Sequence, residues 1–200
     1  MDALKAPEIL SFHDASLAAP AGDARFAEGL WHAIETNHRC NCLLWDEEDL
    51  ARRRSVPDSE IAANKRAIDG YNQKRNDAIE RIDEQLLVLI SKAKTGKHAR
   101  LSSETPGAMI DRLSILSLKI HHMRAQTLRT DVERAHIDAC SAKLARLAEQ
   151  RVDLSGCLER LLEEAARGTA YFKIYRQFKM YNDPALNPAL YGESKRPRRS

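Results

Sequence analysis

The segment from Ile68 to Leu86 repeats its apolar residues at the three- and four-residue spacing of an amphipathic helix. At about 100° per residue, six side chains lie within about 40° of one line on that helix: Ile68, Asn72, Arg75, Ile79, Ile82 and Leu86. The stripe that should face the interior therefore contains an amide and a guanidinium. Because a buried charge without a partner is costly, the fold must place polar groups around Arg75.

Other predicted helices also direct polar side chains inward. On the helix predicted over about 23–54, six residues share a line: Leu30, Ile34, Asn37, Asn41, Leu44 and Glu48. Arg151 lies on the leucine stripe of a later helix. The segment 107–123 is apolar nearly all round, so its polar residues have little solvent-facing surface: Asp111, Arg112, Ser114, Lys119 and His121. We predict an interior polar layer built from Asn41, Glu48, Asn72, Arg75, Asp111 and Arg112, with Asn76 on its flank.

Residues with helix-capping preferences mark where these helices begin and end. Two pairs have the spacing of a capping box: Ser55 with Asp58, and Thr130 with Glu133. Thr105–Pro106 is typical of an N-cap and first helical residue, and Gly168 of a helix end. These signals predict helices over about 23–54, 55–94, 105–123 and 130–168. A short helix should precede them within 1–19, and a short aromatic helix should follow at 171–181.

The sequence thus predicts an all-α fold, a bundle of about five helices, two or three of them long. Prolines in 182–191 predict an extended C-terminal arm that lies over the bundle. Only four valines occur, whereas Ala, Leu, Glu, Lys and Arg dominate, and this usage favours helices over strands. We expect one domain over residues 1–192 and a disordered basic tail at 193–200. Long helices with this spacing also make a homo-oligomer, most simply a dimer, a reasonable expectation.

Charge and cysteine content narrow the class of protein. Four basic residues of the tail exceed the whole net charge of +3, so the rest of the chain sums to −1. A near-neutral body makes a nucleic-acid partner unlikely, because such a surface needs a basic face. The four cysteines do not form a Cys-x-x-Cys site or a secreted disulfide framework. With no signal peptide and no apolar run long enough for a membrane span, a cytoplasmic protein is expected.

Two similar motifs make a metal site an alternative to a simple polar layer. Glu-x-x-His-x-x-x-Cys occurs twice, as Glu35, His38 and Cys42 and again as Glu133, His136 and Cys140. Paired Glu-x-x-His helices occur in di-iron bundles, and two His-Cys pairs could hold zinc. However, the first motif lies about 80–140° from the apolar stripe of its helix, so the two motifs need not meet. The expected site contains no metal, with Glu133, His136, Cys140 and His38 as the alternative ligands, and no cofactor.

Several blocks together resemble an uncharacterised bacterial family, domain of unknown function 4254. They include WDEED, KRAIDGYNQKRNDAIERID, SETPGAMIDRLSILSLKIHHM, the segment around His136 and Cys140, and FKMYNDPALNPALY. The resemblance spans about Leu30 to Tyr191. It implies a helical bacterial protein, often expected near genes for glycan or lipopolysaccharide assembly, and carries no established activity.

These observations lead to three hypotheses of different classes. The first is a bacterial accessory protein of envelope-glycan synthesis that binds an anionic sugar-phosphate or nucleotide-sugar ligand in the polar layer. Its ligand-binding residues would be Asn41, Glu48, Asn72, Arg75, Asn76, Asp111 and Arg112. The second is a non-catalytic dimerising scaffold whose polar layer is structural, and the third is a metal-dependent enzyme. No catalytic residue is predicted, and whether the protein is an enzyme stays open.

Overall fold

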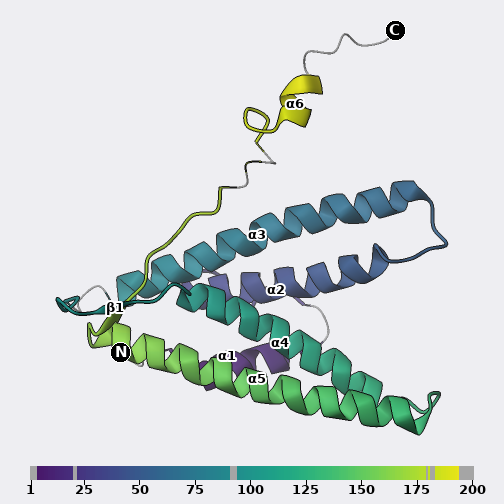
Figure 1. The fold of residues 1–200 in the computed structure, drawn as a ribbon, viewed down its shortest axis with the longest axis horizontal. Helices are drawn as coiled ribbons and strands as arrows, with labels where there is room; N and C mark the ends of the chain where they lie inside the picture. Colours follow the sequence, from purple (N-terminus) through teal and green to yellow (C-terminus); the bar gives the residue numbers. More distant parts are fainter. Residues whose placement is uncertain (1–3, 20–21, 91–93, 179, 181–182, 194–200) are drawn as a thin grey trace.

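The structure is a computed structural model that describes residues 4–19, 22–90, 94–178, 180 and 183–193 (Figure 1). Six helices make up most of this part of the chain: α1 (Ala6–Ala18), α2 (Gly29–Leu50), α3 (Asp58–Ile90), α4 (Pro106–Thr127), α5 (Arg134–Ala166) and α6 (Pro188–Glu193). Two short strands, β1 (Arg100–Leu101) and β2 (Ala170–Tyr171), pair in parallel. The predicted all-α bundle is confirmed.

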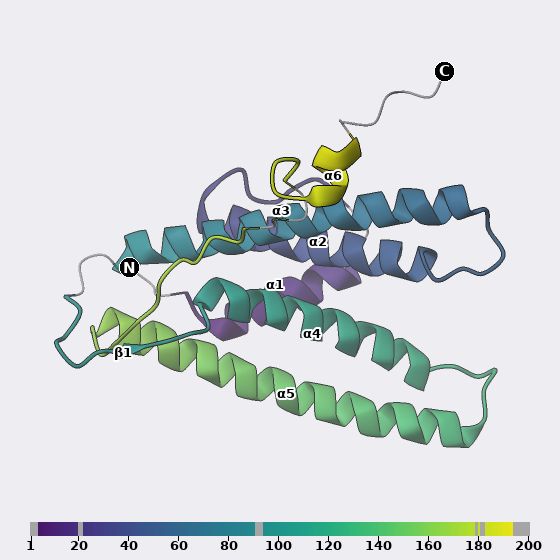
Figure 2. The same ribbon diagram turned by 45° about the horizontal axis from the view of Figure 1, so that its top comes forward.

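Two long helical hairpins form the body of the protein. α2 pairs with α3, α4 pairs with α5, and the two hairpins meet where α4 packs against α2 and α3. The short helix α1 packs against α4 and α5. Figures 1 and 2 show that the hairpins approach each other near β1 and diverge toward the opposite end. α3 continues without a break through Gly70, so the long predicted helix projects as a single element.

The hydrophobic core lies where α1 and the two hairpins meet. Its buried side chains come from every one of the first five helices and from the residues around β2: Ala6, Ile9, Phe12, Ala33, Ile34, Ile82, Leu86, Met109, Ile110, Leu113, Leu154, Leu158, Leu161, Ala170 and Phe172. The first half of α5 contributes little to this core, because it lies at the diverging end. Burial is thus concentrated at one end of the bundle, and the polar layer lies beside it.

The predicted helix starts are partly confirmed. Thr105 caps α4, its hydroxyl accepting a hydrogen bond from the Ala108 amide at 3.2 Å, and Pro106 is the first helical residue. The predicted capping box at Thr130 is wrong, because α5 begins at Arg134 and no side chain caps it. α2 is also shorter than the predicted 23–54.

The C-terminal segment departs from the prediction. Residues 171–178 do not form the predicted aromatic helix, because the backbone of Tyr171 pairs with the 100–102 segment. The Ser102 amide donates a hydrogen bond to the Tyr171 carbonyl at 2.8 Å. Beyond it, Arg176 forms ion pairs with Glu80 at 2.6 Å and Glu84 at 2.5 Å. These contacts hold the chain extended across α3.

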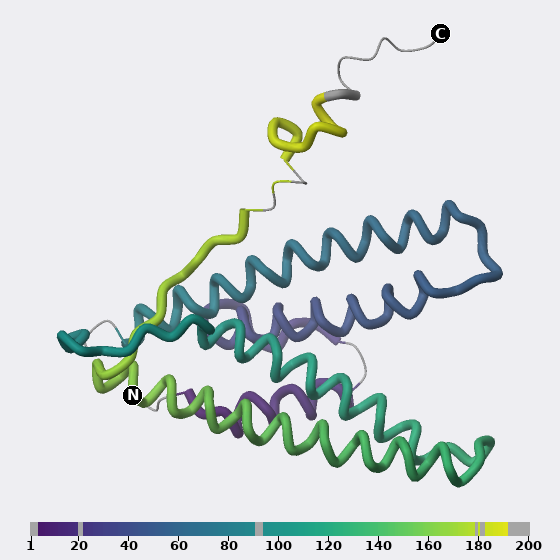
Figure 3. The backbone as a smooth tube through the Cα atoms, in the orientation of Figure 1, coloured from purple at the N-terminus to yellow at the C-terminus, as the bar shows by residue number. Residues whose placement is uncertain are grey.

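The end of the arm is also different from the prediction. Residues 188–193 form α6, and the Asn187 side chain accepts a hydrogen bond from the Ala189 amide at 2.9 Å, which suits a proline at the first helical position. Figure 3 shows the arm leading away from the hairpins rather than lying over them. Of the predicted tail, residues 194–200 lie outside the described residues.

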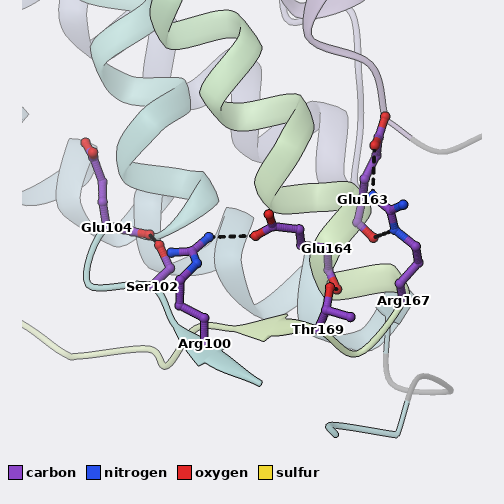
Figure 4. Close-up of polar contacts among 7 residues, drawn as sticks. All are labelled: Arg100, Ser102, Glu104, Glu163, Glu164, Arg167 and Thr169. Atoms are coloured by element: carbon purple, nitrogen blue, oxygen red, sulfur yellow. Dashed lines mark hydrogen bonds and ion pairs between the residues drawn. The ribbon is translucent and has the colours of Figure 1, made fainter. Parts of the chain in front are cut away.

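A cluster of backbone and side-chain contacts joins the 94–105 loop to the end of α5 (Figure 4). Gly96 donates its amide proton to the Gly168 carbonyl at 2.9 Å, and Arg100 forms an ion pair with Glu164 at 2.6 Å. The Thr169 hydroxyl donates to the Glu164 carbonyl at 3.1 Å. The two hairpins are therefore tied together at the end where the core is densest.

In the described ranges, every helix is too short or too polar to cross a bilayer.

Candidate functional site

Asp111 is the centre of the predicted polar layer. Its Oδ1 atom accepts hydrogen bonds from Asn37 Nδ2 at 2.8 Å and Asn41 Nδ2 at 2.9 Å. All three residues are buried between α2 and α4. Hydrogen bonds to a charged group are stronger than those between neutral groups, so these two bonds fix the register of α2 against α4.

A chain of hydrogen bonds continues from this carboxylate to His38. Asn41 Nδ2 also donates to Ser114 Oγ at 3.0 Å, and Ser114 Oγ lies 2.7 Å from His38 Nδ1. The Ser114 hydroxyl can accept from the amide and also pair with His38, and the direction of that second bond depends on the tautomer of His38. His38 Nε2, on the other side of the ring, lies 3.8 Å from Cys42 Sγ. This chain runs through the interface of α2 and α4.

A second histidine lies against the first. The rings of His13 on α1 and His38 on α2 stack with centroids 4.5 Å apart and an interplanar angle of 20°. Burial lowers the pKa of His38 to about 4, and burial together with the neighbouring His38 lowers the pKa of His13 well below its usual value. Neither ring nitrogen of His13 has a hydrogen-bond partner among the described residues. α1 therefore packs on α2 through two uncharged imidazoles.

Acid should remove the stability that neutral His38 provides. The unfolded chain protonates His38 below about pH 6.5 and the folded chain only near its lowered pKa of about 4, so unfolding becomes easier as the pH falls between these values. By pH 4.5 this residue should account for a loss of about 2–3 kcal/mol. Urea unfolding gives the free energy of unfolding of the wild type and of His38→Asn. The difference between the two proteins should be smaller at pH 4.5 than at pH 7, because only the wild type loses this contribution.

The comparison with His38→Asn removes the contributions of titrating groups that do not touch His38; the stacked His13 does respond to the substitution. Asp83, for example, has a pKa that burial raises to about 6, but it is present in both proteins. A stability difference that stays constant between the two pH values would contradict the neutral, buried state of His38.

Arg75 connects the buried layer to solvent. Its Nε atom lies 3.9 Å from Asp111 Oδ1, too far for a hydrogen bond, and is buried with no partner in the part of the chain that is described. The side chain as a whole is 28% exposed. One side of the guanidinium thus faces the carboxylate, and the rest is open to a neighbouring pocket.

This pocket, called the Arg75 pocket below, has a volume of about 310 Å³. It is lined by Asn41, Leu44, Trp45, Glu48, Asp49, Arg52, Asn72, Arg75, Ile115 and Leu118. Glu48 and Arg52 form an ion pair at 2.6 Å on its rim. The pocket thus offers amides and carboxylates, which pair with hydroxyl groups, and a guanidinium, which pairs with an anion, on a partly apolar wall. Such a lining suits a hydroxyl-rich, anionic small molecule.

A second depression, called the basic groove below, adjoins this pocket and shares Trp45 and Asp49 with it. It lies between α2, α4 and α5 and has a volume of about 590 Å³. The Trp45 ring stacks on His122 with centroids 4.3 Å apart and an angle of 5°. The stack therefore joins the two hairpins at the point where both depressions meet.

The structure brings together most of the predicted site residues. Asn41, Arg75 and Asp111 meet in the polar layer, and Asn72 lines the Arg75 pocket. Glu48 also lines it, but its side chain is 46% exposed, so it belongs to the rim and not to the interior.

Four predicted residues lie elsewhere. The interior placement of Arg112 is wrong, because its side chain is 57% exposed and pairs with Glu104 at the outer face of α4. Lys119 and His121 are likewise exposed, although Leu118 and Ile120 between and beside them are buried, so they lie on a face of α4 that the other helices leave open. Asn76 is buried but lines a different pocket, beside Asp83. The inward direction of Arg151 is confirmed by its ion pair with Asp14 at 2.7 Å.

Sequence reasoning missed the histidine stack and the Trp45–His122 stack. His13 lies in a short helix whose partner could not be identified from periodicity, and Trp45 lies off the apolar line of its helix. Asn37 and Ser114 were recognised as inward-facing but were not assigned to the site. Their signal was present, because each shares a helix face with a predicted member, Asn41 and Asp111 respectively.

The alternative metal ligands do not come together. Within 4–19, 22–90, 94–178, 180 and 183–193, no three His, Cys, Asp or Glu side chains are grouped as a metal site requires. His136 approaches Cys140 at 3.4 Å, but Glu133 precedes α5 as its N-cap. The carboxylate of Glu35 accepts hydrogen bonds from the backbone amides of Arg25 and Phe26, so it holds the segment before α2 in place.

Comparison with known proteins places the chain in one family. Neither the curated proteins nor the solved structures include a match. A family model described as "Protein of unknown function (DUF4254)" matches residues 31–174. This range contains the polar layer, the Arg75 pocket and the basic groove, and it excludes α1 and the arm beyond Ile174. The chain belongs to the DUF4254 family.

Proposed function

We propose that this protein is a non-catalytic accessory protein that binds a hydroxyl-rich, anionic small molecule in the Arg75 pocket. The observation that carries the proposal is the state of the Arg75 guanidinium. Its buried Nε lacks an acceptor while the group faces a pocket lined by amides and carboxylates. An anionic ligand in the pocket would pair with the part of this guanidinium that Asp111 leaves open, and it would gain affinity from that charge-assisted contact.

The remaining pocket residues indicate the kind of ligand. Asn41 and Asn72 offer amides, and Glu48 and Asp49 offer carboxylate oxygens that accept hydrogen bonds from sugar hydroxyls. The bacterial glycan and lipopolysaccharide setting expected from the sequence resemblance makes sugar phosphates and nucleotide sugars the first ligands to test. On this proposal the protein works in the cytoplasm, where such compounds are made and used.

Replacing Arg75 with methionine should abolish ligand binding but leave a folded protein. In the wild type, a ligand at 100 times its Kd adds about 2.7 kcal/mol of stability. For a chain of this size that is a rise in Tm of roughly 5–10 °C. Thermal unfolding with a panel of sugar phosphates and nucleotide sugars measures the rise, which should disappear in Arg75→Met.

Arg66→Met is the matched control, because Arg66 lies on the same helix with an exposed side chain outside the pocket. It should keep the full ligand-induced rise in Tm. If no compound shifts the wild-type curve, or if Arg75→Met responds like Arg66→Met, the binding proposal is wrong.

The second candidate is a dimerising scaffold in which the polar layer only sets helix register. The arm favours it, since Tyr175 and Phe178 are 64% and 88% exposed and would be covered by a partner. A scaffold predicts that Arg75→Met alters stability alone, with no ligand effect in either protein.

A further inference from the structure

The basic groove contains three positively charged side chains, more than its lining carboxylate can neutralise. Lys119 on α4 faces Lys143 and Arg146 on α5, and all three side chains are exposed. Among the described residues none of them has an ion pair or hydrogen bond, although most other arginines of the body pair with a carboxylate. Lys143 and Arg146 also lie three residues apart on one helix, where like charges repel.

Of the residues that the structure describes, one acidic side chain lines the groove. Asp49 offsets one of the three positive charges, and burial together with the neighbouring His121 lowers the pKa of His122, which leaves that ring uncharged at neutral pH. The groove therefore has a net charge of about +2 from its lining side chains. A ligand group with two negative charges would balance it.

The other lining residues are apolar or uncharged. Met123 and Leu147 form an apolar floor beside Trp45, and Gln126 and Gln150 add two amides. Apolar and aromatic surface with a few amide groups suits a flat heterocycle, whose faces pack on the floor and whose edge accepts or donates hydrogen bonds. The groove thus combines a place for a base with a place for a doubly charged anion.

We propose that the basic groove binds the nucleoside diphosphate part of a nucleotide sugar, whose sugar enters the adjoining Arg75 pocket. This inference rests on the proposed function and narrows its ligand class. The diphosphate bridge carries two negative charges, which match the net charge of the groove. Trp45 and Asp49 line both depressions, so one ligand can occupy them together. A sugar phosphate without a base would leave the apolar floor uncovered.

Titration calorimetry with UDP, GDP, ADP and CDP tests the proposal, with glucose 1-phosphate as a sugar phosphate that lacks a nucleoside. At least one nucleoside diphosphate should bind more tightly than glucose 1-phosphate. The double variant Lys143→Met/Arg146→Met should weaken that binding by about 10- to 100-fold, because it removes two charge-assisted contacts to phosphate. The affinity should also fall as the salt concentration rises.

Arg160→Met on the same helix is the control, since Arg160 is exposed and lies outside the groove, and it should bind as the wild type does. If none of the nucleoside diphosphates binds, or if the double variant binds them unchanged, the proposal is overturned. Binding of glucose 1-phosphate that is lost in Arg75→Met, with no nucleoside diphosphate bound, would retain the proposed function and reject this inference alone.

Discussion

Replacing Asp111 with alanine should destabilise the protein by about 3–5 kcal/mol, the usual cost of removing one partner from a buried charged network. The substitution removes the acceptor of Asn37 and Asn41 and the nearest negative charge to Arg75. The Asn37 amide would then lose its acceptor, Asn41 would keep only its weaker partners, and the Arg75 guanidinium would lose the opposite charge beside it. The loss of packing is small by comparison, because the deleted group is only a carboxylate.

Urea unfolding followed by circular dichroism gives the free energy for Asp111→Ala and for Arg112→Ala. Arg112 is the adjacent residue on α4, and its exposed ion pair with Glu104 should contribute at most about 1 kcal/mol. The isosteric Asp111→Asn keeps an acceptor but loses the charge, and should fall between these two variants. Equal losses for Asp111→Ala and Arg112→Ala would show that the polar layer does not hold the helices together.

The polar layer was the part of the site that could be predicted from sequence. Asn41 and Arg75 lie on apolar stripes, and a helix that faces its neighbours with a stripe must bury whatever the stripe contains. Periodicity gives the direction of each side chain relative to its own helix. It does not give the tilt between helices, and so the exposure of Glu48 near the diverging end could not be predicted.

Arg112 and His38 show the same limit of periodicity. Arg112 was predicted to be buried and is exposed, whereas His38 lies off the predicted buried stripe and is buried. Arg112 lies on a helix so apolar that every face looked internal, yet the packed structure leaves one face of α4 open. His38 lies off the stripe of α2, yet it is only 1% exposed because α1 covers that side. The position of α1 depends on contacts between residues distant in sequence, such as those of His13, and local pattern contains no information about them.

The arm could not be predicted because its conformation depends on partners outside it. Tyr171 and its neighbours are largely aromatic and have only a weak preference for a helix, and the strand pair with Arg100–Leu101 and the ion pairs of Arg176 favour an extended chain. Local propensities amount to tenths of a kcal/mol per residue, and a few tertiary contacts exceed them.

Gly168, by contrast, was recognised in the sequence as a helix end, and the structure explains why glycine is needed. It follows α5 with φ of +73°, and its Cβ, if present, would lie 2.2 Å from the carbonyl oxygen of Lys94. The left-handed conformation alone costs a residue with a side chain about 1–2 kcal/mol, and the clash involves backbone that cannot rotate away. Gly168→Ala should therefore destabilise the protein by about 3–5 kcal/mol.

The same helix provides a control with the opposite sign. Gly156 lies inside α5, and a Cβ there would meet no atom within 4 Å, so Gly156→Ala should raise the stability by about 0.5–1 kcal/mol. The urea midpoints of the two variants should move in opposite directions from that of the wild type. The 94–105 loop should also exchange its amide protons faster in Gly168→Ala, because the Gly96–Gly168 hydrogen bond ties it to α5. A Gly168→Ala protein as stable as the wild type would mean that the loop and α5 do not meet as closely as the structure requires.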